Sequence, residues 1–203
     1  GLFPNIGKGD KAAYNSIDAP MWFFWAVQEY DKALGEPGTV WKNYGSKNLF
    51  GRYGNRNSIA VEMCVQKGYD YETAFLHTVE LVKDVVRGVP VTPRAGYAVE
   101  INALWYNAVC YMLKLAEEAK DNTFIKEWKD MPELIRTSFV ETFWNEETGY
   151  LADYVDEKGQ NLDVRPNQVF ACSLTYSPIT DDMKERVLKV VTRELLTPKG
   201  LRT

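Results

Sequence analysis

Apolar side chains recur at helical spacing along most of this sequence. The longest such run covers residues 99–120, where they keep a helical period over about six turns. A broad apolar stripe predicts a further helix over residues 70–87, and residues 180–196, with Thr180 as cap, form the last expected helix. Shorter helices are expected over 17–30, 58–66, 124–131, 132–143 and 166–174. The pattern predicts an all-α chain.

One stretch departs from the helical period. Residues 150–156 alternate between apolar and polar side chains and predict one short strand, so we expect a small β excursion near 149–156. No alternation of strands with helices suggests a parallel sheet. Long loops are expected after Tyr30, Arg87 and Phe143, and long ordered loops in a helical domain tend to hold ligands.

The composition and net charge limit which binding partners are expected. The 203 residues suit one domain or a piece of a larger one, and 45% hydrophobic with 26% charged residues is ordinary for a globular chain. A net charge of -4 gives no electrostatic reason to expect nucleic acid or an anionic membrane as partner. We find no apolar run near the roughly 18 residues that span a bilayer. The chain begins at Gly1 rather than Met, so cellular location cannot be read from this end.

Carboxylates are the best candidates for any catalysis. The three cysteines Cys64, Cys110 and Cys172 lack metal-ligand spacing, so we expect free thiols and neither a metal site nor a cofactor. The single histidine, His77, rules out mechanisms that need two histidines and makes a Ser-His-Asp triad a poor choice. Six Trp and 12 Tyr provide many rings on which flat ligands can stack.

The first polar cluster lies between residues 91 and 107. Here a proline-containing loop with Arg94 leads into a helix that carries Glu100, Asn102 and Trp105 near its start. Sugar hydroxyls need planar hydrogen-bonding partners such as these, and the apolar faces of sugar rings stack on aromatic rings. The cluster predicts a sugar site. A helix start that only packs against the core would use the same residues, and this interpretation stays open.

Two further clusters repeat the chemistry at helix starts. One holds Tyr14, Asn15, Asp18 and Trp22, although Asp18 could equally serve as a partner of the helix dipole. The other is a rigid turn of Arg165, Pro166, Asn167 and Gln168, whose arginine could instead satisfy loop carbonyls. If these helices form one inner layer, the three clusters would line a single cleft.

Several blocks of the sequence resemble the C-terminal domain of glycogen debranching enzyme. They include Gly1 to Asn5, Tyr14 to Phe23, Pro90 to Asn107, Phe143 to Leu151, Arg165 to Gln168 and Leu196 to Thr203. The resemblance spans nearly the whole chain. It implies an (α/α)6 toroid and a cytoplasmic amylo-α-1,6-glucosidase that acts on α-glucan by the inverting route, without metal or other cofactor.

The resemblance also suggests catalytic carboxylates. Glu100 is the best-matched acidic residue, and Asp18 also lies in a matching block. Family members usually carry a Thr-Trp-Met-Asp motif before the Thr-Pro-Arg block, whereas this chain has Asp84 one residue out of register and lacks the Trp-Met pair. Residues 52–86 therefore form a divergent segment within an otherwise continuous domain over 1–203. If this segment has replaced the family motif, the catalytic acid of the family is missing from it.

The chain is too short for the complete toroid that the resemblance implies. A closed (α/α)6 toroid needs twelve helices, and the pattern predicts fewer. We therefore expect an incomplete toroid that belongs to a larger chain or self-associates through exposed apolar flanks. The leading hypothesis is hydrolysis of α-1,6-linked glucose at glycogen branch points, and the alternative is a non-catalytic α-glucan-binding helical domain. A helical protein-interaction module is a third hypothesis, but it leaves the polar helix starts unexplained.

Overall fold

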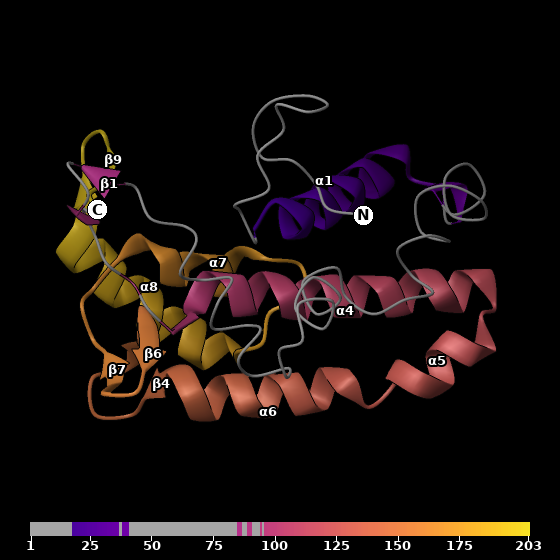
Figure 1. The fold of residues 1–203 in the computed structure, drawn as a ribbon. Coiled ribbons are helices and arrows are strands. Elements are labelled where there is room, and N and C mark those ends of the chain that lie inside the picture. Colours follow the sequence, from indigo (N-terminus) through magenta and orange to yellow (C-terminus); the bar gives the residue numbers. More distant parts are fainter. Residues whose placement is uncertain (1–17, 37, 41–84, 87–88, 91–93, 95) are drawn as a thin grey trace.

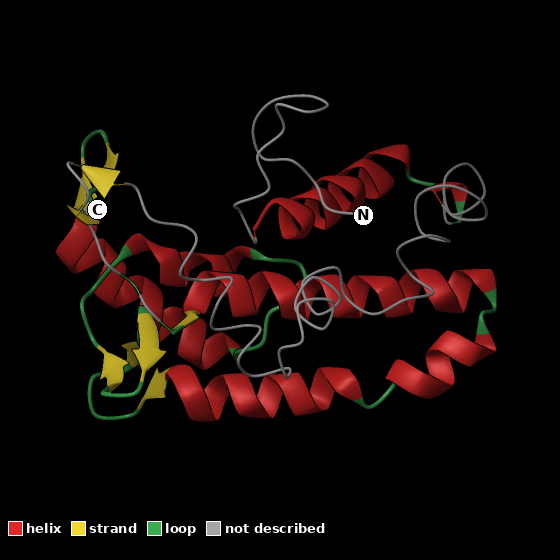
Figure 2. Cartoon of the chain, in the orientation of Figure 1, coloured by secondary structure: helices red, strands yellow, loops and turns green. Residues whose placement is uncertain are grey.

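The computed structural model describes residues 18–36, 38–40, 85–86, 89–90, 94 and 96–203. This part of the chain is mostly helical and carries several short antiparallel sheets (Figures 1 and 2). The predicted helical class is confirmed, and the closed toroid stays a prediction. The predicted residues Tyr14, Asn15 and Asp84 lie outside the described residues, as do the predicted helix over 58–66 and most of the helix over 70–87.

Helix α4 (Val99–Ala119) is the centre of the fold and agrees with the strongest helix prediction. It contacts α1 (Asp18–Leu34), α5 (Asn122–Trp128), α6 (Met131–Phe143) and α7 (Val169–Ser173). Figure 1 shows α1 along one side of α4, while α6 runs back along the other side after α5 turns the chain. The helix ends at Lys120, whose left-handed backbone (φ 58°) lets its N–H donate to the carbonyls of Ala116 and Glu117.

The main core lies where α4 meets α6, α7 and α8 (Asp181–Leu195). Leu104 of α4, Phe143 of α6, Ala171 of α7 and Val187 of α8 are each at most 2% exposed and belong to one cluster. These positions come from the apolar stripes of four helices that are distant in sequence. Full burial of a Val, Leu or Phe side chain such as Val187, Leu104 or Phe143 typically stabilises the fold by about 1.5–3 kcal/mol.

Helix α8 begins where the sequence predicts. Thr180 is its N-cap, and its hydroxyl oxygen accepts a hydrogen bond from the Met183 N–H at 3.3 Å. Asp181 and Asp182 lie in the first turn, where the helix dipole favours negative charge. The prediction of Thr180 as cap is confirmed, and the helix ends at Leu195.

The prediction of one strand over residues 150–156 is wrong, because two strands from different sheets occupy this stretch. Strand β5 (Tyr150–Leu151) pairs with β4 (Trp144–Asn145). Strand β6 (Tyr154–Asp156) pairs with β3 (Tyr97–Ala98) on one side and β7 (Gly159–Asn161) on the other. Between them the chain changes partner: Ala152 donates to Phe143, and Asp153 to Asn161. Alternation of side chains predicts extended backbone but not which strand it pairs with.

Other short strands were also not predicted. Val85 and Val86, expected at the end of a helix, form β1 (Val85–Val86), which pairs with β2 (Val89–Pro90). Valine is β-branched and suits a strand, and Gly88 and Pro90 disfavour a continuing helix. A second hairpin, β8 (Leu196–Thr197) with β9 (Gly200–Leu201), follows α8 directly. The expected helix over 166–174 starts as a 3-10 turn, η3 (Pro166–Gln168), before α7.

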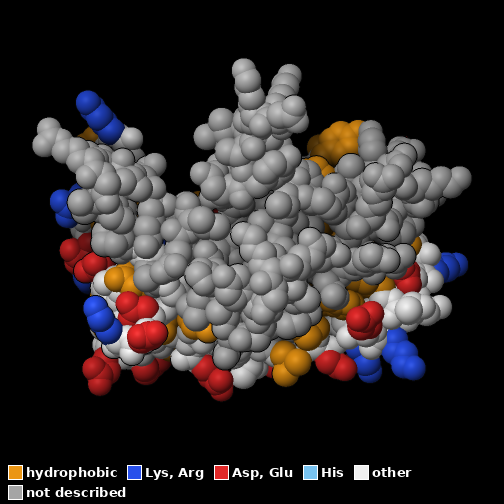
Figure 3. All heavy atoms as spheres, viewed as in Figure 1, with side chains coloured by type: hydrophobic (Ala, Val, Ile, Leu, Met, Phe, Trp, Pro, Cys, Tyr) orange, Lys and Arg blue, Asp and Glu red, His pale blue; other side chains and the backbone are white. Residues whose placement is uncertain are grey.

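The described surface carries charges of both signs. Figure 3 shows acidic and basic side chains interspersed along the lower edge of the visible face, with hydrophobic side chains between them. Within the described ranges, no helix is long and apolar enough to cross a membrane. Cys110 and Cys172 are free thiols of intermediate burial, and Cys64 lies outside the described residues.

Candidate functional site

The start of α4 brings together polar groups from two of the three clusters that the sequence predicts. Strand β3 runs straight into α4, and the Val99 N–H donates to the Asp153 carbonyl at 3.1 Å. The cap residue Ala98 offers no side-chain oxygen, so the backbone of the β6 region supplies this acceptor. Glu100 follows in the first turn, where its negative charge suits the helix dipole.

Arg94 and Glu100 form a two-pronged ion pair. Arg94 Nη1 lies 2.5 Å from Glu100 Oε1, and Nη2 lies 2.7 Å from Oε2. The two side chains are 18% and 17% exposed, so the pair is neither free in solvent nor fully buried. This fork geometry sets the orientation of the carboxylate as well as its position.

Asp153 lies behind this pair and is the residue that sequence reasoning missed. Arg94 Nη2 donates to its backbone carbonyl at 2.8 Å, and Arg94 Nε lies 2.7 Å from its Oδ2. Asn167 Nδ2 donates to Asp153 Oδ1 at 2.9 Å, and Arg165 Nε lies 3.8 Å from Oδ2. The Asp153 side chain is only 1% exposed. We call Arg94, Glu100, Asp153, Arg165 and Asn167 the α4 cluster.

The Arg94 contact with Asp153 Oδ2 is electrostatic rather than a well-directed hydrogen bond. Arg94 Nε and Asp153 Oδ2 are buried and have no hydrogen-bond partner among the described residues, despite their 2.7 Å separation. A signal for Asp153 was present in the sequence, because it is a charged residue among Leu151, Ala152, Tyr154 and Val155. A charge in such a position must be paired when the stretch is buried.

The formal charges of the α4 cluster cancel, with two carboxylates against two guanidiniums. Burial raises the pKa of Asp153, and this effect outweighs the attraction of nearby Arg94. Burial alone would lower the pKa of Arg94, but the hydrogen bonds and charge of Glu100, together with Asp153, raise it above its ordinary value. Arg94 therefore stays charged at any working pH.

Part of the α4 cluster is exposed to solvent. Arg94, Glu100 and Arg165 each keep part of the side chain exposed, and Arg165 is the most exposed of these three at 29%. Guanidinium donors beside a carboxylate acceptor match the mixed donor and acceptor character of sugar hydroxyls.

The second predicted cluster forms a separate contact on α1. Trp22 Nε1 donates to Asp18 Oδ2 at 3.2 Å across one helical turn. The Trp22 ring meets Phe170 of α7 edge-on, with centroids 5.2 Å apart, and meets Trp25 at 5.9 Å. Trp22 therefore takes part in the packing of α1 on α7 while its indole N–H holds the Asp18 carboxylate.

The remaining predicted residues make local contacts. Asn102 Nδ2 donates to the Ala98 carbonyl at 2.8 Å, and the Trp105 ring meets Trp128 of α5 edge-on at 6.4 Å. Gln168 is 1% exposed, and its side chain accepts from Leu151 N–H and donates to the Arg165 carbonyl. The structure thus gathers Arg94, Glu100, Arg165 and Asn167. The side chains of Asn102 and Trp105 contact residues outside this group, and Gln168 meets it at the Arg165 backbone carbonyl.

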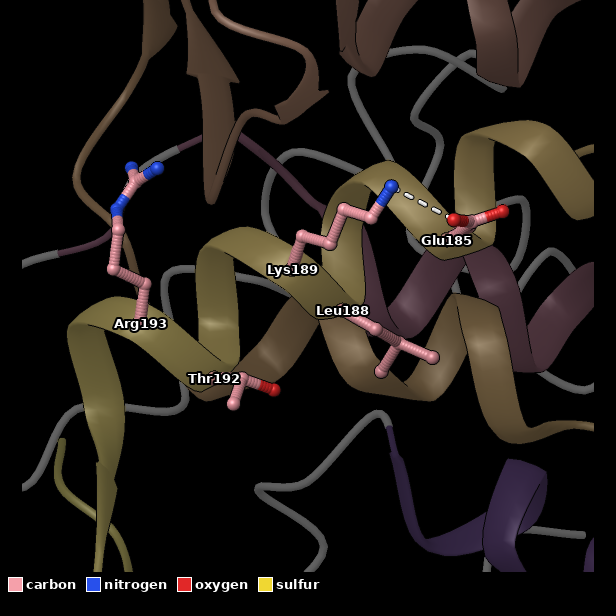
Figure 4. Close-up of a pocket in the computed structure, with 5 residues that line it drawn as sticks. All are labelled: Glu185, Leu188, Lys189, Thr192 and Arg193. Atoms are coloured by element: carbon pink, nitrogen blue, oxygen red, sulfur yellow. Dashed lines mark ion pairs between the residues drawn. The ribbon is translucent and has the colours of Figure 1, made fainter.

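A shallow depression on α8 is lined by other residues. Figure 4 shows Glu185, Leu188, Lys189, Thr192 and Arg193 along it, with an ion pair of 2.7 Å between Lys189 and Glu185. No aromatic ring is among these described lining residues, and the two charged partners are largely exposed. In the part of the chain that the structure describes, no group of three or more His, Cys, Asp or Glu could hold a metal ion.

Comparison with known proteins establishes the family. The family model described as amylo-alpha-1,6-glucosidase matches residues 1–203. The chain therefore belongs to the amylo-alpha-1,6-glucosidase family, which confirms the resemblance and relates the chain to glycogen debranching and glucan substrates. Searches of curated proteins and of solved structures give no match.

Proposed function

We propose that this chain forms part of an inverting glycoside hydrolase that releases α-1,6-linked glucose from branch points of glycogen or a similar α-glucan. One observation carries the proposal: the match to the family over the whole chain includes a partly exposed carboxylate, Glu100, that Arg94 holds in a fixed orientation. A carboxylate fixed beside exposed guanidinium donors is what a site needs to orient a sugar and act on it.

The chemistry requires two carboxyl groups in different roles. In an inverting glycosidase one protonates the leaving oxygen and the other activates water, at a separation of roughly 6.5–9.5 Å. We assign Glu100 to the activation of water, in which a carboxylate accepts a proton, because both of its oxygens already accept hydrogen bonds from Arg94. Asp18 and Asp84 are the candidates for the other role. Arg165, Asn167 and Trp22 are proposed to hold the sugar.

Release of free glucose from a branched limit dextrin tests the proposal on the full-length protein. We expect Glu100→Gln to lower kcat/KM by about 100-fold or more, the usual range for loss of a catalytic acid or base. Glu185→Gln is the matched control, because Glu185 is also a helical glutamate in an ion pair but is 67% exposed on α8. Equal rates for wild type and Glu100→Gln would refute the role of Glu100.

A second candidate function is non-catalytic binding of α-glucan. The specific observation in its favour is that residues 78–88 lack the Trp-Met pair and carry Asp84 one residue out of register with the expected catalytic aspartate. Calorimetry with maltooligosaccharides separates the two proposals. Binding by a wild-type protein that releases no glucose would support the binding domain, and glucose release would support the hydrolase.

A further inference from the structure

Asp153 connects four segments of the chain at the candidate site. Its backbone N–H donates to Asn161 of β7, and its carbonyl accepts from Val99 of α4 and from Arg94. Its carboxylate accepts from Asn167 of η3 and lies 2.7 Å from Arg94 Nε. Main chain and side chain of one residue thus tie the Arg94 segment, α4, β7 and η3 together.

Asp153 is too deeply buried to touch a sugar. Its side chain is 1% exposed, whereas Arg94 and Glu100 in front of it are 18% and 17% exposed. Any influence on a ligand must therefore pass through the groups that it holds. Arg94 is the direct link, because the same guanidinium contacts Asp153 with Nε and Nη2 and Glu100 with Nη1 and Nη2.

The charge balance of the α4 cluster makes the contact between Asp153 and Arg94 sensitive to substitution of Asp153. With Asp153 ionised, two carboxylates face two guanidiniums. An amide at position 153 would leave Glu100 as the one carboxylate of the α4 cluster, against the two guanidiniums of Arg94 and Arg165. It would also place either an N–H group or a weaker acceptor against Arg94 Nε, and removal of one partner from a buried pair leaves the other charge uncompensated.

We propose that Asp153 is a positioning residue: it fixes the Arg94 guanidinium, and through it the orientation of the Glu100 carboxylate toward a bound sugar. The inference rests on the proposed function in taking Glu100 as the group that acts on the sugar. It adds a residue that the sequence patterns did not single out.

A double-mutant cycle on glucose release tests the proposal. Misplacement of a reacting group by about 1 Å can cost up to 100-fold, so Asp153→Asn should lower kcat/KM roughly 10- to 100-fold, mainly through kcat. In a Glu100→Gln background the same change should lower kcat/KM by less than about threefold, because the carboxylate that Asp153 helps to orient is already absent. Equal losses in both backgrounds would overturn the proposal.

Asp31→Asn is the matched control for mere loss of stability. Asp31 is also a buried aspartate, 5% exposed, and pairs with Lys114 at 2.7 Å between α1 and α4. It should lower thermal stability while changing kcat/KM by less than about threefold in either background. All rates are measured well below the unfolding midpoint of the least stable variant. If Asp153→Asn fails to fold, Asp153→Glu keeps the charge but moves the carboxylate, and the same cycle applies.

Failure of the proposed function leaves this inference testable. If wild type binds maltooligosaccharides without turnover, the cycle is run on Kd with the same expectation. If it neither binds nor cleaves, the proposed function fails. The side-chain ¹⁵Nε signal of Arg94 then decides, since it should shift and become more mobile in Asp153→Asn and stay unchanged in Asp31→Asn. An unchanged Arg94 signal in Asp153→Asn would overturn the inference.

Discussion

Gly96 is the position where the smallest side chain should do the most damage. Its φ is +92°, and a Cβ built there would lie 2.1 Å from the Val155 carbonyl oxygen and 3.0 Å from the Asp156 Cα. Both of those atoms belong to the backbone of β6. This strand pairs with β3, which begins at the residue after Gly96. Backbone cannot rotate away as a flexible side chain can. We therefore expect Gly96→Ala to separate β3 from β6.

The expected cost follows from two contributions. A non-glycine residue at positive φ of this kind costs about 1–3 kcal/mol. Relief of the clash needs a displacement of roughly 1 Å, because carbon and oxygen atoms cannot approach much closer than van der Waals contact. This movement would weaken the hydrogen bonds of Val99 and Arg94 to the Asp153 carbonyl, at about 1 kcal/mol each. The total is about 3–5 kcal/mol.

Gly159→Ala separates the two contributions. Gly159 also has a positive φ, +104°, but nothing lies within 4 Å of its built Cβ. This variant should lose only the conformational part, about 1–3 kcal/mol. Urea unfolding followed by circular dichroism gives the free energy of unfolding for both variants. If Gly96→Ala is no less stable than Gly159→Ala, the close approach of β3 and β6 is refuted.

The long helices were predictable because their signals are local. The apolar period over 99–120 and the Thr180 cap each depend on neighbours within one or two turns, and α4 and α8 begin and end within a residue or so of the predicted bounds. The short strands depend instead on partners far along the chain. Tyr97 pairs with Val155, for example, and nothing in either stretch by itself indicates the other.

The candidate site was also predictable only in part. Arg94, Glu100, Arg165 and Asn167 were predicted because polar side chains at helix starts are visible in the sequence. Their link was not, because Asp153 contacts Arg94, Arg165 and Asn167, and through Arg94 is connected to Glu100, only when β6 pairs with β3.

Trp105 shows how tertiary contacts limit such predictions. Its ring was expected to stack on a sugar, and in the structure it meets Trp128 of α5 edge-on. An aromatic ring near a helix start can serve packing or a ligand, and only the folded arrangement reveals its protein neighbours.

Two further predictions concern Asn107 and Cys172, which are not members of the α4 cluster. Asn107 is 1% exposed, donates to Gln28 at 3.0 Å and accepts from the Tyr176 N–H at 3.1 Å, so Asn107→Ala should lower the free energy of unfolding by about 2–4 kcal/mol, because it leaves buried polar partners unsatisfied. A loss below about 1 kcal/mol in urea unfolding would contradict this network. Burial raises the pKa of Cys172 from 9.0 to about 11. A thiol with a raised pKa in the folded state contributes stability that is fully present below pH 9 and is lost as the pH rises through about 11. Cys172→Ser retains a donor for the Gln168 carbonyl, now a hydroxyl, but does not ionise in this range. The stability difference between wild type and Cys172→Ser should therefore change in favour of the variant from pH 9 to 11, and a difference that stays constant with pH would show that the thiol ionises as readily in the folded chain as in the unfolded one.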